Sequence, residues 1–232
     1  MFECLLCSKK MDVRPNLLLL LTGYVPVQER LCNDCWQNFK EIGTYFCSGC
    51  GRVEKKKRYC LDCRKWQKRG MAMLENQALY QYNEEMKDYM ARYKFIGDYR
   101  LAPIFAGKMR RAIRRRVKEE KIDMILPIPL SEERMAQRGF NQVEAFLPVF
   151  AKKVDLLAVK ASHKIDQSSK SRSERLKTRQ PFELKAGMAG QVAGKHILLV
   201  DDVYTTGRTL YHAAQLLRQA GARKVSSQTL AR

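Results

Sequence analysis

The side chains best suited to chemistry in this sequence lie in one short segment, residues 201–209. Two adjacent carboxylates are followed by three hydroxyl side chains around a glycine and an arginine: Asp201, Asp202, Thr205, Thr206, Gly207, Arg208 and Thr209. Carboxylates accept hydrogen bonds from sugar hydroxyls or hold water around a Mg²⁺ ion, while hydroxyls and the open backbone of a glycine suit a phosphate. The segment therefore predicts a site that binds both ends of a ribose phosphate.

The flanking residues predict how this segment is held. The aliphatic run that precedes it, residues 197–200, is typical of a parallel strand covered on both faces. Apolar residues then recur with helical spacing from Leu210 to Leu217, and Gly221 is placed to end that helix. The segment thus lies between the carboxyl end of a strand and the N-terminus of a helix, where free backbone N–H groups favour an anion.

Two other interpretations fit parts of this segment. Aliphatic residues followed by two aspartates also resemble the Walker B strand of nucleotide hydrolases, but the sequence contains no G-x-x-x-x-G-K-S/T phosphate loop. An ordinary strand, turn and capped helix would need the acidic pair, the Thr-Thr-Gly turn and the third threonine to coincide by chance. A sugar-phosphate site is the better explanation.

The thirteen residues Ile197–Thr209 resemble the phosphoribosyl-pyrophosphate (PRPP) motif of type I phosphoribosyltransferases. The resemblance implies that Asp201 and Asp202 contact the ribose hydroxyls, that the loop Thr205–Thr209 holds the 5′-phosphate, and that Mg²⁺ accompanies PRPP. Tyr204 stands where that family usually has an aliphatic residue. This variant, DDVYTTG, points to one branch, the ComF family of competence proteins.

Three further segments resemble the ComF family, so the similarity spans almost the whole chain. They are Tyr93–Asp98, Pro127–Gln142 and Gln180–Phe182, although the asparagine usual shortly before that phenylalanine is absent. The resemblance places a pyrophosphate loop after the first core strand and a hood that closes over PRPP. These two parts supply four candidate residues: Arg134, Arg138, Gly139 and Arg175.

All eight cysteines fall into C-x-x-C pairs, the spacing that turns two thiolates toward one tetrahedral ion. The four pairs supply two Cys₄ sites: Cys4, Cys7, Cys32, Cys35, Cys47, Cys50, Cys60 and Cys63. Disulfides are the alternative, but no secretory signal is visible and the cysteines are clustered, so structural zinc is the better interpretation. Sequential pairing gives one site from the first two pairs and one from the last two, and interleaved pairing stays open. The ComF resemblance likewise implies an N-terminal double zinc ribbon.

Length and composition fit two small domains, and the composition changes after Cys63. We expect a double zinc ribbon over residues 1–70 and an α/β domain over residues 71–232, with the parallel sheet flanked by helices of type I phosphoribosyltransferases. The predicted core strands lie near residues 124–128, 156–159, 197–200 and 225–230. The predicted helices lie near residues 84–93, 101–116, 133–153 and 209–220, and Pro148 should kink or end the third of these.

The formal net charge of +20 is concentrated in three segments, residues 52–69, 108–121 and 160–179. Such blocks favour a polyanion by counterion release, and Tyr59 and Trp66 are candidates to stack on bases. Each block alone is equally typical of a solvated helix face or loop, but so large a charge without an anionic partner is costly. The cations most suited to nucleic acid lie around the fourth cysteine pair: Lys55, Lys56, Lys57, Arg58 and Lys65.

Two functions remain open at this point. The ComF resemblance implies a PRPP-binding protein of DNA uptake in natural transformation, which handles single-stranded DNA with a ComFA-like helicase. The alternative is an active phosphoribosyltransferase that acts on a nucleobase or another nucleophile, although no base-specificity element is recognisable. The strongest apolar run, Leu17–Leu21, is too short to span a membrane, so we expect a soluble cytoplasmic protein.

Overall fold

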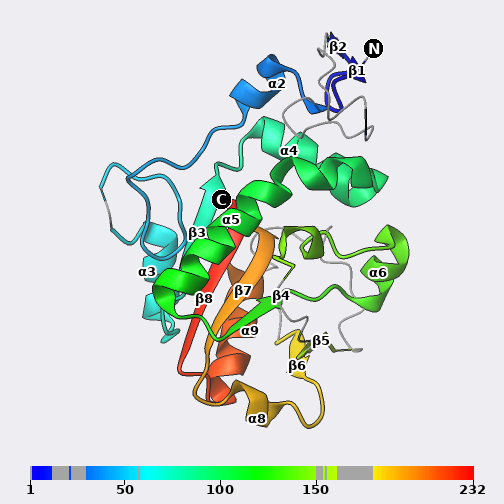
Figure 1. The fold of residues 1–232 in the computed structure, drawn as a ribbon. Helices are drawn as coiled ribbons and strands as arrows, with labels where there is room; N and C mark the ends of the chain where they lie inside the picture. The colour runs from blue at the N-terminus through cyan, green and yellow to red at the C-terminus, as the bar shows by residue number, and fades with distance from the viewer. Residues whose placement is uncertain are drawn as a thin grey trace.

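A computed structural model describes residues 2–11, 21, 30–56, 58–149, 154, 156–160 and 180–232 of this chain. Its centre is a four-stranded parallel sheet with the strand order β3-β8-β7-β4 (Figure 1). The strands are β3 (Glu75–Tyr80), β4 (Met124–Pro127), β7 (His196–Val203) and β8 (Lys224–Ala231). The expected α/β fold with a parallel sheet flanked by helices is confirmed.

The strand that leads into the acidic pair is the most buried part of this sheet. Residues 197–200 of β7 are all 0% exposed. Alternate residues of this run belong to two hydrophobic clusters, one shared with α5 (Ala102–Glu120) and the other with α9 (Arg208–Gln219). The two helices therefore cover opposite faces of the sheet, which explains why this run is apolar at every position.

The edge strand β3 is held by polar side chains. No sequence pattern indicates β3, because its residues show no clean alternation of apolar and polar side chains. Asn76 donates a hydrogen bond to Thr229 Oγ1 at 3.1 Å and accepts one from Ser227 Oγ at 2.9 Å. All three side chains are buried, so these bonds between strands fix the register of the edge.

The prediction of one helix over residues 133–153 is wrong. The helix α6 ends at Arg138, because Gly139 follows with a φ of 73°, in the left-handed region that ends helices. A 3₁₀ turn, η4, then covers Glu144–Phe146, so the chain has left the helix well before Pro148. In the α/β part, the described residues also form α4 (Glu84–Ala91), η2 (Arg92–Ile96), η3 (Tyr99–Leu101), α6 (Glu132–Arg138) and α8 (Ala189–Val192).

Residues near 156–159 form a strand, but outside the parallel sheet. β5 (Leu157–Val159) pairs antiparallel with β6 (Phe182–Leu184) in a separate two-stranded sheet. The predicted strand is therefore present, and Leu157 is buried in the hydrophobic cluster shared with α9, but the strand does not join the central sheet. Between β5 and β6, the basic segment after Lys160 lies outside the described residues, as do Arg175 and, earlier in the chain, Lys57.

The described residues of the cysteine-bearing part form the short elements β1 (Phe2–Glu3), β2 (Lys10–Met11), α2 (Asn33–Asn38) and α3 (Leu61–Lys68). In Figure 1, α2 lies near β1 and β2, whereas α3 lies beside the sheet. Cysteines of the first two pairs share a hydrophobic cluster with α5, and those of the last two share one with α9. The boundary at residue 70 stays a prediction. Within the described ranges, no helix combines the length and apolar character needed to cross a membrane.

Candidate functional site

The loop between β7 and α9 has the predicted strand-to-helix geometry. Gly207 caps the N-terminus of α9 with a φ of 79°, a conformation that glycine adopts without strain. A side chain at this position would also collide with the hydroxyl group of Tyr204. The turn itself thus requires a glycine here. The first N–H groups of α9 lack partners within the helix and can bind an anion.

The two aspartates at the end of β7 have different partners. Asp202 is 4% exposed. Its Oδ1 accepts a hydrogen bond from Lys94 Nζ at 2.8 Å, and its Oδ2 accepts one from Gln142 Nε2 at 2.6 Å. Asp201 Oδ1 accepts the backbone N–H of Asp202 at 2.9 Å. Burial and the adjacent Asp202 carboxylate raise the pKa of Asp201 to about 7. Two side-chain donors therefore hold Asp202, and Asp201 titrates near neutral pH.

Both aspartates open onto a cavity of about 730 Å³. The cavity brings together most of the residues predicted for PRPP: Asp201, Asp202, Thr205, Thr206, Arg208, Thr209, Arg134 and Arg138. Gly139 and Gly207 form the turns beside it rather than its lining. The structure thus joins residues 205–209, the predicted phosphate loop, and the pyrophosphate candidates on α6 into one site.

Several lining residues have no role predicted from the sequence. Lys94 and Gln142 hold Asp202, although they stand 108 and 60 positions away from it along the chain. Val159, Pro181 and Phe182 add apolar surface from the β5–β6 side. Lys94 and Gln142 both lie in segments that resemble the ComF family, and this resemblance is the only sequence feature that singles out these segments. No spacing rule connects either residue to the acidic pair.

The rear of the phosphate loop rests on α3, the helix of the last cysteine pair, Cys60 and Cys63. Trp66 of α3 donates its Nε1–H to the carbonyl of Thr206 at 3.1 Å and stacks on Tyr211 of α9, with the ring centroids 4.5 Å apart. Arg232 donates to the carbonyls of Tyr204 and Thr205 at 3.2 and 2.9 Å. The prediction that Trp66 stacks on nucleic-acid bases is therefore wrong, because its ring is buried against the loop helix.

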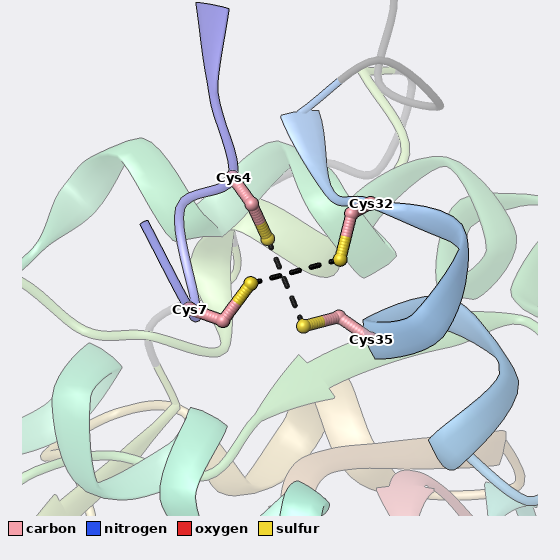
Figure 2. Close-up of side chains that lie close together, drawn as sticks. All are labelled: Cys4, Cys7, Cys32 and Cys35. Carbon is pink, nitrogen blue, oxygen red and sulfur yellow. Dashed lines mark hydrogen bonds between the residues drawn. The ribbon is translucent and has the colours of Figure 1, made fainter. Parts of the chain in front are cut away.

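The cysteines form two groups by sequential pairing: Cys4, Cys7, Cys32 and Cys35, and then Cys47, Cys50, Cys60 and Cys63. Figure 2 shows the four sulfur atoms of the first group pointing toward a common centre. Sγ–Sγ distances in the two groups are 3.5 to 3.7 Å, close to the edge of about 3.8 Å in a tetrahedron with Zn–S bonds of about 2.3 Å. The donor sets fit zinc, and the geometry rules out interleaved pairing.

The basic residues divide into exposed and structural ones. Lys55, Lys56, Arg58 and Lys65 are exposed. Arg116, in the second basic segment, is instead 1% exposed, where it pairs with Glu120 and donates to the backbone carbonyl of Ser227. That segment is therefore not a uniform cationic face. Part of its charge fixes α5 to the sheet.

Known proteins resemble this chain over its whole length. Residues 98–232 match the Phosphoribosyl transferase domain family. The Competence protein ComFC of Streptococcus pneumoniae is 38% identical, and the match covers 99% of this chain and 100% of that protein. The Competence protein ComFC of Bacillus subtilis is 34% identical, and the match covers 99% of this chain and 94% of that protein.

This chain belongs to the ComFC family of competence proteins. The more distant Competence protein F of Haemophilus influenzae is 27% identical, and the match covers 100% of this chain and 97% of that protein. In this ComFC-family chain, the acidic pair, the phosphate loop and α6 all lie within the phosphoribosyl transferase domain. The two cysteine groups precede that domain.

Proposed function

We propose that this ComFC-family chain binds PRPP at the end of β7 and acts in the cytoplasm during DNA uptake in natural transformation. The observation that carries the proposal is that two aspartates and a threonine loop at the N-terminus of α9 line one cavity. The carboxylates suit the ribose hydroxyls, and the N–H and hydroxyl groups of the loop suit the 5′-phosphate. Relatives with 34% and 38% identity are named competence proteins.

The pyrophosphate group of PRPP would bind at α6. Arg134 and Arg138 line the same cavity as the acidic pair, and guanidinium groups bind phosphate oxygens in a bidentate manner. Arg138 also donates a hydrogen bond to Gln142 Oε1 at 3.1 Å, and the amide group of Gln142 donates to Asp202. One hydrogen-bonded chain thus connects the pyrophosphate candidate with the ribose candidate.

Calorimetric titration with PRPP in the presence of Mg²⁺ tests this site. Asp202→Ala and Thr206→Val should each weaken binding by about 1–3 kcal/mol, the usual loss for one charge-assisted or buried hydrogen bond. Asp88→Ala and Thr44→Val are matched controls, because both residues are exposed and do not line the cavity. Unchanged affinity in both site variants would contradict the assignment.

We also propose that the exposed cations bind single-stranded DNA, in cooperation with a ComFA-like helicase. Lys55 and Lys56 are exposed beside the second cysteine group, where a phosphodiester backbone can reach them. A relative from Escherichia coli that is 33% identical over 47% of this chain is named a DNA utilization protein. Such contacts to phosphates provide affinity without sequence preference.

Zinc is the ion that we propose for both cysteine groups. Four thiolate ligands leave no open coordination position, so the metal would stabilise the fold rather than take part in a reaction. The short elements α2 and α3 support this role, because each begins directly after a cysteine, Cys32 and Cys60 respectively.

An active phosphoribosyltransferase is the second candidate function. Val159, Pro181 and Phe182 give the cavity an apolar side next to the acidic pair, and such a surface suits a flat acceptor such as a nucleobase. Pyrophosphate release from PRPP, measured with a panel of nucleobases, separates the two candidates. Turnover would establish the transferase, whereas PRPP binding without release would favour a ligand-binding role in DNA uptake.

A further inference from the structure

Lys94 holds the buried side of the acidic pair. Its Nζ lies 2.8 Å from Asp202 Oδ1, and the two side chains are only 19% and 6% exposed. Gln142 Nε2 donates a hydrogen bond to the other carboxylate oxygen, Asp202 Oδ2, at 2.6 Å. Both oxygens of Asp202 therefore have donors before any ligand enters the cavity.

The backbone places Lys94 at this position by an unusual turn. Residues Arg92–Ile96 form a π-helix, η2, which ends at Gly97 in the left-handed conformation with a φ of 70°. Widened turns of this kind are frequent at functional sites. The preceding residue, Tyr93, is fully buried and donates its hydroxyl to the backbone carbonyl of Gln142 at 3.0 Å. The same turn thus fixes both partners of Asp202.

This arrangement does not fit a Mg²⁺ ion bound directly to Asp202. Mg²⁺ requires oxygen ligands at about 2.0–2.1 Å in octahedral geometry. An ion at that distance from Oδ1 would lie beside the ammonium group of Lys94, and like charges so close in a buried site repel strongly. At Asp201, Oδ1 accepts the backbone N–H of Asp202, which reduces the number of acceptor sites that this carboxylate has left for an ion.

The cavity is also cationic without a metal. Among the described residues, four cationic side chains besides Lys87, which pairs with Glu84, line it against three carboxylates: Lys94, Arg134, Arg138 and Arg208, and then Glu133, Asp201 and Asp202. A ligand with a monophosphate and a pyrophosphate group therefore finds an excess of positive charge supplied by the protein. The usual electrostatic need for a divalent cation is reduced.

We infer that Lys94 takes the place of a divalent cation at Asp202, so that this chain binds PRPP with little dependence on Mg²⁺. This inference rests on the proposed PRPP site. Mg²⁺ that accompanies PRPP would be held by the phosphates of the ligand and not by Asp202. Lys94 remains beside Asp202 and supplies the positive charge at the ribose end of the cavity.

Titration calorimetry with PRPP, in excess Mg²⁺ and in EDTA, tests the inference. The wild-type protein should lose less than about tenfold in affinity when EDTA replaces Mg²⁺. Lys94→Gln keeps a hydrogen-bond donor but removes the charge, and in EDTA it should bind about 10–100-fold more weakly than wild type, the range for one charged hydrogen bond. Mg²⁺ should restore most of that loss. Lys94→Arg should behave like wild type.

Lys87→Gln is the matched control. Lys87 lines the same cavity but pairs with Glu84, not with Asp202, so this variant should keep the weak Mg²⁺ dependence of the wild type. Equal loss of affinity in the two glutamine variants would show a general charge effect and overturn the inference. Complete loss of wild-type binding in EDTA would also overturn it.

A second measurement does not depend on PRPP. Electron paramagnetic resonance with Mn²⁺ alone should detect a new bound ion in Lys94→Gln, because the variant removes the positive charge beside Asp202 Oδ1, and none at this position in wild type or Lys94→Arg. Absence of a new ion in Lys94→Gln would contradict the inference. If no protein binds PRPP in either buffer but the Mn²⁺ result holds, the proposed PRPP function fails while the role of Lys94 stands.

Discussion

Trp66 links the second cysteine group to the phosphate loop, and its substitution should affect both stability and PRPP affinity. The indole N–H donates to the carbonyl of Thr206 at 3.1 Å, and the ring stacks on Tyr211 with an interplanar angle of 20°. Trp66→Phe keeps an aromatic ring against Tyr211 but removes the hydrogen bond. Trp66→Leu removes both interactions.

The expected magnitudes follow from these two contacts. The hydrogen bond contributes about 0.5–1.5 kcal/mol to the free energy of unfolding, and the aromatic stack adds about 0.5–1.5 kcal/mol. Trp66→Phe should therefore cost about 1 kcal/mol, and Trp66→Leu about 2–3 kcal/mol including lost packing. Arg232 still holds Thr205 at 2.9 Å, so the loop should loosen without unfolding. If the free energy of about 1 kcal/mol that the hydrogen bond contributes to ordering the loop is lost, PRPP should bind about fivefold more weakly.

Urea denaturation and PRPP titration measure the two effects, and zinc content shows whether the cysteine group stays intact. Trp36→Phe is the matched control, because Trp36 packs against Phe105 with the ring centroids 5.8 Å apart and is remote from the loop. The control should lose stability but keep its PRPP affinity. Our reasoning fails if Trp66→Phe binds PRPP like wild type, or if the control loses as much affinity.

Three further predictions concern metal, pH and nucleic acid. Elemental analysis should find about two zinc ions per chain, and a chelator should remove the ion of the first group earlier, because Cys7 is exposed whereas all four cysteines of the second group are buried. The fold favours the neutral form of Asp201, whose pKa is raised from 3.8 to about 7, so Asp201→Asn should raise the melting temperature at about pH 8. That advantage should shrink as the pH falls below 7 and disappear near the unfolded-state pKa, at about pH 4; an equal gain at about pH 8 and pH 4 would contradict this. Affinity for single-stranded DNA should fall with salt at a log–log slope of about −0.7 per phosphate contacted, and a salt-independent affinity would contradict the interface. Replacing the four adjacent cations Lys55, Lys56, Lys57 and Arg58 by serine should flatten that slope. Asp202→Ala should leave the slope unchanged.

The sequence alone determines the parts of this protein whose chemistry is local. The strand, acidic pair and loop of residues 197–209 are contiguous, so hydrophobic burial, the glycine turn and the helix start can all be read from neighbouring residues. The cysteine pairs are equally local, because C-x-x-C spacing itself directs two thiolates to one ion. The end of α6 shows the limit of such reading, because apolar residues beyond Gly139 continue a helix-like pattern while the backbone turns away.

Only the tertiary structure decides which distant residues meet. Lys94 reaches Asp202 across 108 positions and Trp66 reaches Thr206 across 140, and neither contact leaves a spacing pattern in the sequence. The edge strand β3 is fixed by the buried partners of Asn76 on β8, which local propensity does not reveal. The hydrophobic effect that drives packing is non-directional and specifies no individual partner. Which polar side chains meet is therefore decided only when the helices and strands have packed.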